Sequence, residues 1–270
     1  MNILYANIDR QIRDSEAKNN EIESPLISEN IHNPYDFEHP AIGEHFYGRK
    51  TELKRLKDAL LENRSVAIYG LQRIGKTSLV DNILDNEIAK SPENIVIKID
   101  MFAVSESCLS YIDFFSVISD TICDYFETDY LKVKDEFSVY LRSTDHSNLK
   151  HGFTNILKEG KRKLKKKKLI LFIDEFQDII KTFEYASSKK VSNPLNPEFV
   201  RFIGSLVKER VLELIICCRY NIFRLDKEYD LQLLKLMTEI WLGVLDESSA
   251  KELIQHPVNS VVKYDPQAIN

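Results

Sequence analysis

The residues best suited to chemistry form one short stretch, in which two glycines bracket a loop and a lysine and a threonine follow. Gly70-Leu71-Gln72-Arg73-Ile74-Gly75-Lys76-Thr77 has the spacing G-x-x-x-x-G-K-[ST]. Glycine permits a tight turn in which successive backbone N–H groups point at phosphate oxygens. We expect Lys76 to reach the β and γ phosphates and the Thr77 hydroxyl to ligate Mg²⁺. The pattern therefore predicts a nucleotide site.

Two consecutive carboxylates follow the apolar run Leu169–Ile173 and could serve the same chemistry. Hydrolysis of a γ phosphate needs a metal ion, a group that orients water, and positive charge near the transferring oxygens. We expect Asp174 to hold Mg²⁺ beside Thr77, and Glu175 to polarise the attacking water. The alternative interpretation of this acidic pair is that it caps a helix.

Several arginines could supply the positive charge. Arg219 follows the apolar run Leu212–Cys218, where it could sense the γ phosphate; the alternative is a surface ion pair. Arg73, inside the glycine loop, could guard the phosphates or bind an acidic neighbour. An arginine finger from a second subunit has three unranked candidates, Arg201, Arg210 and Arg224.

The elements that must position these groups follow from alternating apolar runs and helical patterns. The runs predict strands at residues 66–69, 95–99, 169–173, 212–218 and 239–244. Helical spacing predicts helices from a Thr51 N-cap, from Ser105 to about Phe126, over 148–163, around 199–207, over 230–237 and after Asp246. Strands separated by helices indicate an α/β, doubly wound parallel sheet, with ligands at the carboxyl ends of its strands.

Composition limits the remaining possibilities. The 270 residues are 43% hydrophobic, and no apolar run approaches the ~20 residues of a membrane span. The net charge of −5 does not argue for nucleic acid. The basic run Lys161–Lys168 precedes a strand, so it belongs to the sheet edge opposite the nucleotide. We favour a solvated helix end there over a nucleic-acid patch. Four cysteines without metal spacing, and no apolar signal-peptide centre, fit a reducing cytoplasm.

From Asn33 to its end the chain resembles the STAND branch of AAA+-like P-loop ATPases, close to the archaeal and bacterial ATPase-domain group. The resemblance rests on the hhGR-like box Phe46-Tyr47-Gly48-Arg49, the stretch RIGKTSL and the stretch LILFIDEFQD. It implies a five-stranded P-loop NTPase sheet of order 5-1-4-3-2. It also implies an N-terminal segment (1–42), an ATPase core (43–245) and the start of a helical lid (246–270). The chain stops where relatives continue, which suggests a truncated or unusually short member.

The resemblance implies an ATP-binding, Mg²⁺-dependent ATPase switch that oligomerises or engages a partner protein, in signalling or antiviral defence. Adenine is preferred to guanine on this ground alone. The implied catalytic residues are Lys76, Glu175 and Arg219, and the implied metal ligands are Thr77 and Asp174. The implied ATP/ADP-binding set is Phe46, Tyr47, Gly48, Arg49, Gly70, Leu71, Gln72, Arg73, Ile74, Gly75, Lys76, Thr77 and Ser78. Two alternatives stay open: a DNA-associated AAA+ adaptor of the origin-recognition or transposition-regulator kind, and a scaffold that binds nucleotide without hydrolysing it.

Overall fold

The computed structural model describes residues 35, 39–104, 106–124, 145–163, 165 and 168–258. The chain divides into two units after Asp36, and the helices and strands of the described residues all lie in the second unit. Most of the predicted N-terminal segment and residues 259–270 of the predicted lid lie outside the described residues. The predicted domain boundaries stay predictions.

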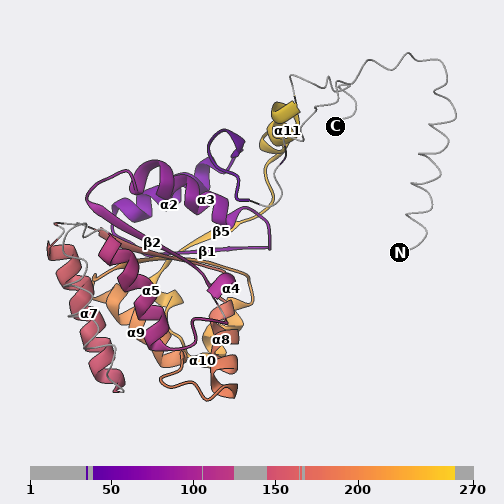
Figure 1. Ribbon diagram of the computed structural model, residues 1–270. Helices are drawn as coiled ribbons and strands as arrows, with labels where there is room; N and C mark the ends of the chain where they lie inside the picture. Colours follow the sequence, from indigo (N-terminus) through magenta and orange to yellow (C-terminus); the bar gives the residue numbers. More distant parts are fainter. Residues whose placement is uncertain are drawn as a thin grey trace, which may run out of the picture. The chain divides into compact units, whose positions relative to one another are not determined.

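The fold is built on a sheet of five parallel strands (Figure 1). Their spatial order is β2-β3-β4-β1-β5, which confirms the expected order 5-1-4-3-2. Each β1 residue from Val66 to Tyr69 lies between a residue of β4 and a residue of β5, so β1 is an interior strand of the sheet. The strand bounds are β1 Val66–Gly70, β2 Asn94–Asp100, β3 Lys168–Asp174, β4 Glu213–Cys218 and β5 Thr238–Leu242.

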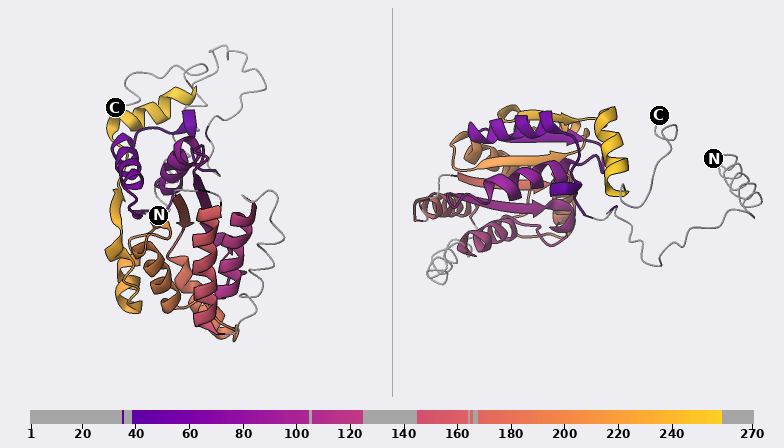
Figure 2. Two further views of the ribbon diagram at one scale, coloured as in Figure 1. Left: turned by 90° about the vertical axis from the view of Figure 1, so that its left-hand side faces the viewer. Right: turned by 90° about the horizontal axis from the view of Figure 1, so that it is seen from above.

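Helices cover both faces of the sheet, and alternate strand residues pack against them (Figures 1 and 2). Val66 and Ile68 join a core with α2 (Lys50–Leu61) and α3 (Lys76–Ile83), whereas Ala67 and Tyr69 join the core on the other face. Burial on both faces explains why β1, β3 and β4 are almost wholly apolar, whereas the outer strands β2 and β5 also have exposed residues. The second face is covered by α5 (Tyr111–Asp124), α7 (His146–Lys163), α8 (Asp178–Ser188), α9 (Pro197–Lys208) and α10 (Ile222–Tyr229).

The prediction that a helix starts from a Ser105 cap is wrong. A short helix, α4 (Met101–Val104), comes first, and α5 begins only at Tyr111. Ser110 and Asp113 form the cap, because the Asp113 carboxylate accepts from the Ser110 N–H (2.9 Å) and the Ser110 hydroxyl accepts from the Asp113 N–H (3.2 Å). Ser105 and Phe126 themselves lie outside the described residues.

The leucine-rich helix predicted over residues 230–237 is also wrong. The chain leaves α10 at Asp230, which has the left-handed φ of 48°, and Gln232 repeats that conformation with φ 59°. Only the short 3₁₀ turn η3 (Leu234–Leu236) follows. Leu231 and Leu233 are nevertheless buried, so these leucines fill the core from irregular backbone rather than from one stripe of a helix. Helix α8, in contrast, was not predicted.

After β5, helix α11 (Glu247–Gln255) begins as predicted, because the Asp246 carboxylate accepts from the Ser249 N–H at 2.9 Å. The short turns are η1 (Gly43–His45), the π turn η2 (Leu84–Ile88) and η4 (His256–Val258). In the described ranges, Cys108, Cys217 and Cys218 are buried and form no disulfide. No described helix combines the length and apolar character that crossing a bilayer requires.

Candidate nucleotide-binding site

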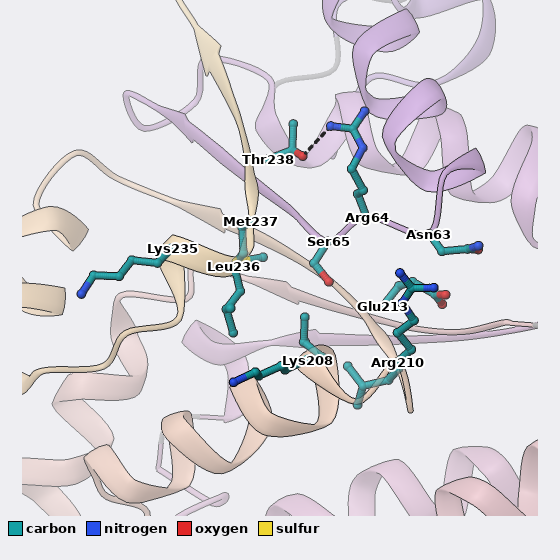
Figure 3. Close-up of a pocket in the computed structure, with 12 residues that line it drawn as sticks. Asn63, Arg64, Ser65, Lys208, Arg210, Glu213, Lys235, Leu236, Met237 and Thr238 are labelled. Carbon is teal, nitrogen blue, oxygen red and sulfur yellow. Dashed lines mark hydrogen bonds between the residues drawn. The ribbon is translucent and has the colours of Figure 1, made fainter.

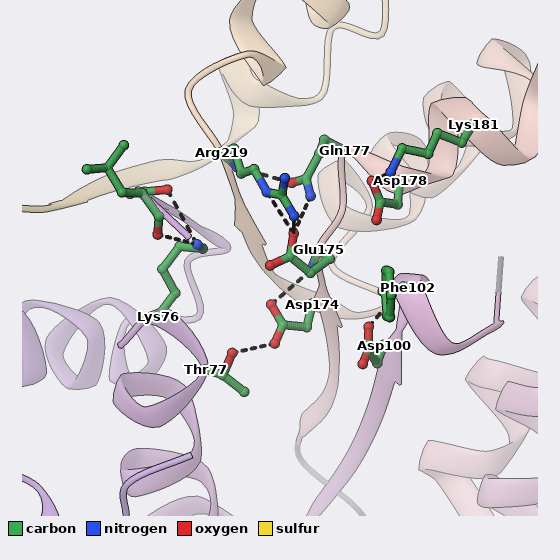
Figure 4. A network of polar contacts seen from close by, with 12 residues as sticks. Lys76, Thr77, Asp100, Phe102, Asp174, Glu175, Gln177, Asp178, Lys181 and Arg219 are labelled. Atoms are coloured by element: carbon green, nitrogen blue, oxygen red, sulfur yellow. Dashed lines mark hydrogen bonds and ion pairs between the residues drawn. The ribbon is translucent and has the colours of Figure 1, made fainter. Parts of the chain in front are cut away.

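The predicted catalytic and metal-binding residues meet at the carboxyl edge of the sheet (Figure 4). Strand β1 runs into the glycine loop and α3, β3 ends at Asp174, and β4 ends one residue before Arg219. These three strands are parallel neighbours, so their carboxyl ends lie side by side. Topology alone therefore brings the loop, the acidic pair and the arginine to one edge.

The glycine loop closes around the amine of its own lysine. Gly75 has φ +95°, a conformation that strongly favours glycine, and α3 begins at the next residue. Lys76 is only 4% exposed, and its Nζ donates to the carbonyl of Leu71 (2.9 Å) and that of Gly70 (3.4 Å). Phosphate oxygens that enter the loop would replace these carbonyls as partners of the amine. Arg73 is exposed, and no hydrogen bond or ion pair joins it to the described residues.

Thr77 and Asp174 bring the loop and β3 into direct contact. The Thr77 hydroxyl donates to Asp174 Oδ2 at 2.5 Å, and the Glu175 N–H donates to Asp174 Oδ1 at 2.8 Å. Asp174 is 9% exposed. Burial raises the pKa of its carboxyl, the two hydrogen bonds oppose that shift, and the carboxylates of Glu175 and Asp100 add to it. A cation placed here would relieve this unfavourable burial of negative charge.

Thr77 and Asp174 fit a hard divalent cation, because both present oxygen atoms to the same point. In the described part of the chain, no group of three or more His, Cys, Asp or Glu side chains is arranged to hold a metal ion. Mg²⁺ does not need such a group, since it commonly takes one or two protein ligands and completes its shell with phosphate and water. This donor set suits Mg²⁺ better than zinc, which favours nitrogen and sulfur ligands.

Glu175 is tightly held by its neighbours. Its Oε2 accepts from Arg219 Nε (3.2 Å) and Nη2 (3.1 Å), and also from the amide of Gln177. Glu175 has φ +47°, an unusual conformation for a residue with a long side chain. The ion pair considered for Arg219 does exist, but its partner is the site's own carboxylate. The predicted acid and the predicted sensor are therefore in contact.

Two residues at this edge were given no role from the sequence. Gln177 lies in the turn between β3 and α8, is 5% exposed, and accepts from the Arg219 N–H at 3.1 Å. Asp100 lies opposite Asp174 in the register of β2 and β3. Asp100 could have been found, because it ends a predicted strand in the same way as Asp174. The signal for Gln177 was its position two residues after Glu175, which is weak on its own.

Within the hhGR-like box, Arg49 reaches the glycine loop. Its Nη2 donates to the carbonyl of Gly243 (2.6 Å) and to that of Ile74 (3.3 Å), so it joins the segment after β5 to the loop. Arg49 is 8% exposed and occupies the N-cap position of α2 with φ 60°. The prediction that Thr51 caps this helix is therefore wrong, because α2 already begins at Lys50.

The rest of the box contacts α11 and the turn after it. The Tyr47 hydroxyl lies 3.0 Å from His256 Nδ1, and a Cβ on Gly48 would lie 2.6 Å from the Ser249 Cβ. Phe46 packs against the core beneath α2 and α3. Ser78 is engaged by the preceding segment, since its hydroxyl accepts from the Ala41 N–H at 3.0 Å. Of the four box residues, Arg49 is the one with a hydrogen bond to the glycine loop among the described contacts.

A separate hollow of about 300 Å³ lies at the opposite, amino edge of the sheet (Figure 3). Its lining includes four cationic side chains and the buried carboxylate of Glu213; the cations are Arg64, Lys208, Arg210 and Lys235. Arg64 follows the end of α2, and Lys208 and Arg210 lie at the end of α9. Cations are favoured at helix C-termini by the carbonyl dipoles there. This hollow contains none of the predicted nucleotide residues.

Comparison with known proteins points to the same part of the chain as the site residues. The family model for an ATPase domain found predominantly in Archaea matches residues 46–219. This match begins at the first residue of the hhGR-like box and ends at Arg219. No curated protein matches the chain.

Three solved structures share the fold at low sequence identity. A Walker-type ATPase of Pyrococcus abyssi is 14% identical with TM-score 0.56, covering 88% of this chain and 65% of its own. The Aeropyrum pernix ORC2 protein, in ADPNP and ADP complexes, is 12% identical with TM-score 0.55 over 87% and 58%. The Aeropyrum pernix ORC1 protein, in complex with DNA, is 14% identical with TM-score 0.53 over 82% and 53%. The chain thus spans 53–65% of the length of these structures.

Proposed function

The chain belongs to the ATPase domain family found predominantly in Archaea, and we propose that it binds ATP with Mg²⁺ and hydrolyses it to ADP and phosphate. The observation that carries this proposal is the 2.5 Å hydrogen bond between Thr77 of the glycine loop and Asp174 of β3. It joins the phosphate-binding element to the acidic strand end beside Lys76. A triphosphate and a metal ion bound at one edge require this juxtaposition.

The residues of this edge have complementary roles in the proposed hydrolysis. The loop N–H groups and Lys76 hold the β and γ phosphates, and Thr77 and Asp174 hold Mg²⁺, which supplies charge neutralisation for the phosphate oxygens when bound. Glu175 orients a water molecule and accepts its proton as the water oxygen bonds to the γ phosphorus. The bond between that phosphorus and the β–γ bridging oxygen breaks, and ADP leaves with the electron pair.

Arg219 would neutralise charge on the γ phosphate. Its guanidinium lies beside Glu175, at 3.1–3.2 Å from Oε2, so the sensor and the water-orienting group share one location. A γ phosphate competes with Glu175 for this guanidinium. Binding ATP in place of ADP then changes the partners of Arg219, which gives the site a means of distinguishing the two nucleotides.

We further propose a STAND-like switch in which the nucleotide state controls oligomerisation or engagement of a partner protein, as in signalling or antiviral defence. Support comes from the hhGR-like box, which links the glycine loop to the segment beyond β5. Arg49 bonds Ile74 and Gly243, and Tyr47 bonds His256 after α11. A shift of the loop on nucleotide exchange would pull on these contacts.

Association with nucleic acid is the second candidate function, and the amino-edge hollow favours it. Lys208, Arg210 and Lys235 line this hollow, and in the described ranges none of the three forms a salt bridge. Phosphate contacts of this kind supply sequence-independent affinity for DNA. The placement of two of these cations at a helix end weighs against the proposal, because that end alone favours positive charge.

The experiment that tests the main proposal combines turnover with particle size. Phosphate release from ATP is measured with Mg²⁺ and with EDTA, and light scattering gives the molecular mass with ATP, with ADP and without nucleotide. We expect Mg²⁺-dependent turnover and a mass that differs between ATP and ADP. Absence of Mg²⁺-dependent phosphate release would overturn the ATPase proposal, and an unchanged mass would overturn the switch proposal alone.

A further inference from the structure

We propose that Gln177 is a positioning residue for hydrolysis, which ties the Glu175 carboxylate to the backbone of Arg219 through the two ends of its amide. This inference rests on the proposed ATPase function. The Gln177 side chain is buried at the turn between β3 and α8, where it lies between the two residues (Figure 4). It donates to Glu175 Oε2 and accepts from the Arg219 N–H.

Its two partners fix the orientation of the amide. The backbone N–H of Arg219 is a donor, so the Gln177 atom that faces it at 3.1 Å must be the oxygen. The carboxylate of Glu175 accepts only, so the atom that faces it must be the NH₂ group. The flipped amide would set donor against donor and oxygen against carboxylate. Gln177 therefore has a single orientation that satisfies both neighbours.

The two oxygens of the Glu175 carboxylate have different surroundings. Oε2 accepts from the Gln177 amide and from two nitrogens of Arg219. Within the described part of the chain, Oε1 has no hydrogen-bond partner. One oxygen is thus held by the protein while the other stays available to a water molecule. General-base catalysis depends on such orientation, since a displacement of about 1 Å lowers the rate strongly.

The backbone around Gln177 shows why a side chain is needed for this task. Regular pairing of β3 with β4 ends at Ile173 and Ile216. Beyond that pair, the Phe176 N–H donates to the Cys217 carbonyl at 2.9 Å, and the Arg219 N–H finds its partner in Gln177 Oε1. The turn at Glu175 has positive φ, a conformation that persists only when its surroundings hold it. Gln177 extends the β3–β4 connection to Arg219 and holds this turn in place.

The experiment compares three variants with the intact chain. Gln177→Met removes both hydrogen bonds at nearly constant volume. Gln177→Glu keeps an acceptor for the Arg219 N–H but sets a second carboxylate against Glu175. Gln232→Met is the matched control, because the Gln232 side chain is exposed and donates to Asp230, away from the site. For each variant we measure kcat and KM for ATP over pH, the affinity for a fluorescent ATP analogue, and the unfolding temperature.

We expect Gln177→Met to lower kcat about tenfold, which corresponds to the loss of one orienting hydrogen bond, with the analogue's affinity changed by less than about twofold. Gln177→Glu should move the acid limb of the kcat profile to higher pH, because two adjacent carboxylates retain a shared proton. A purely structural role for Gln177 would not lower kcat in Gln177→Met while the analogue's affinity and the unfolding temperature stay unchanged. Gln232→Met should match the intact chain throughout.

Three results would overturn the inference, and they have different causes. If the intact chain hydrolyses ATP and Gln177→Met retains its kcat, Gln177 does not position Glu175, and the proposed ATPase function still stands. If the intact chain binds ATP without hydrolysing it, the hydrolytic function fails and the inference fails with it. If Gln177→Met does not fold, the Gln177→Glu profile decides, and an acid limb at its original pH contradicts the inference.

Discussion

Two buried carboxylates at opposite edges of the sheet, Asp174 and Glu213, have different surroundings. At the carboxyl edge, both oxygens of Asp174 accept hydrogen bonds, from Thr77 and from the Glu175 N–H. At the amino edge, Glu213 is 7% exposed, and its Oε2 has no hydrogen-bond partner among the described residues. Burial raises the pKa of both carboxyl groups. The two carboxylates are thus similarly buried, but both oxygens of Asp174 accept hydrogen bonds, whereas one oxygen of Glu213 accepts none from the described residues.

This difference shows that the short polar contacts between separate elements are concentrated at the carboxyl edge. The carboxyl edge links loop, strand ends and turn through short contacts between different elements: Thr77 with Asp174, Gln177 with Glu175, and Arg219 with both residues of that turn. The amino edge gathers cations at the ends of α2 and α9, around an open hollow. The contacts at the carboxyl edge are suited to catalysis, whereas the cations at the amino edge interact with the carbonyl dipoles at the ends of helices. Substitutions at each edge separate these two interpretations.

Glu175→Gln should have the largest effect. It keeps the size of the side chain but removes the group that accepts the proton of water, so we expect turnover to fall at least about 100-fold. ATP affinity should stay near that of the intact chain, because the glycine loop and Lys76 are untouched. Phosphate release and binding of a fluorescent ATP analogue measure the two quantities. Unchanged turnover would favour a nucleotide-binding scaffold.

Arg219→Ala should reduce turnover about tenfold to 100-fold, since it removes positive charge from the γ phosphate and one anchor of Glu175. ADP affinity should change less than ATP affinity, because ADP has no γ phosphate. Arg224 offers a matched control, as it is exposed and pairs with Glu228 within α10. Competition binding of ATP and ADP to both variants provides the measurement. Equal losses for the two nucleotides would argue against a sensor role.

Asp174→Asn and Glu213→Gln should each stabilise the fold at neutral pH by about 1 kcal/mol. Each removes a buried charge, and the Thr77 hydroxyl can turn to accept from an asparagine at position 174. The native pKa of each carboxyl is raised, so the native state holds its proton to higher pH than the unfolded chain. Stability therefore falls as pH rises from the ordinary carboxyl range through the raised value.

Urea unfolding should accordingly show a higher free energy of unfolding for both variants than for the intact chain at pH 7. This difference should disappear in acid. Only Asp174→Asn should also abolish Mg²⁺-dependent turnover. If Glu213→Gln lowered turnover equally, the contrast between the two edges would not hold.

Neutralising the amino edge should have the smallest effect on catalysis. Lys208→Gln combined with Arg210→Gln lies at the far edge of the sheet, so we expect turnover within about twofold of the intact chain. The same double variant tests the second candidate function by fluorescence anisotropy with labelled duplex DNA at low salt. Salt-sensitive binding that the double variant loses would support nucleic-acid association. Absence of binding to the intact chain would exclude it under those conditions.

The sequence predicted those parts of the fold that depend on local pattern. The apolar strands and the glycine loop are confirmed, because doubly buried strands and a G-x-x-x-x-G-K-[ST] loop have strong signatures. The order of the sheet is also confirmed, but it was implied by the family resemblance rather than by any local pattern. The predicted helix over 230–237 is wrong, because the same leucines can fill a core from irregular backbone. The predicted helix start at Ser105 is wrong, because the reciprocal pair Ser110 and Asp113 caps α5 five residues later.

Within the site, the sequence placed Lys76, Thr77, Asp174, Glu175 and Arg219 at strand ends, and the structure brings them to one edge. Their catalytic and binding roles stay predictions. Gln177 could not be assigned, because its importance arises from contacts with two residues that are brought together only by the β3–β4 pairing. The family resemblance placed Arg49 in the nucleotide-binding set, but its contacts with the carbonyls of Ile74 and Gly243 could not be predicted, because these residues are far apart in sequence.

The most direct test compares a lysine from each edge by calorimetric titration with Mg²⁺-ATP. Lys76→Ala removes the amine inside the glycine loop, and Lys208→Ala removes one at the amino edge. The expected result is loss of at least about 100-fold in ATP affinity for Lys76→Ala, with Lys208→Ala equal to the intact chain. Equal affinity for Lys76→Ala and the intact chain would contradict the assignment of the triphosphate to the carboxyl edge.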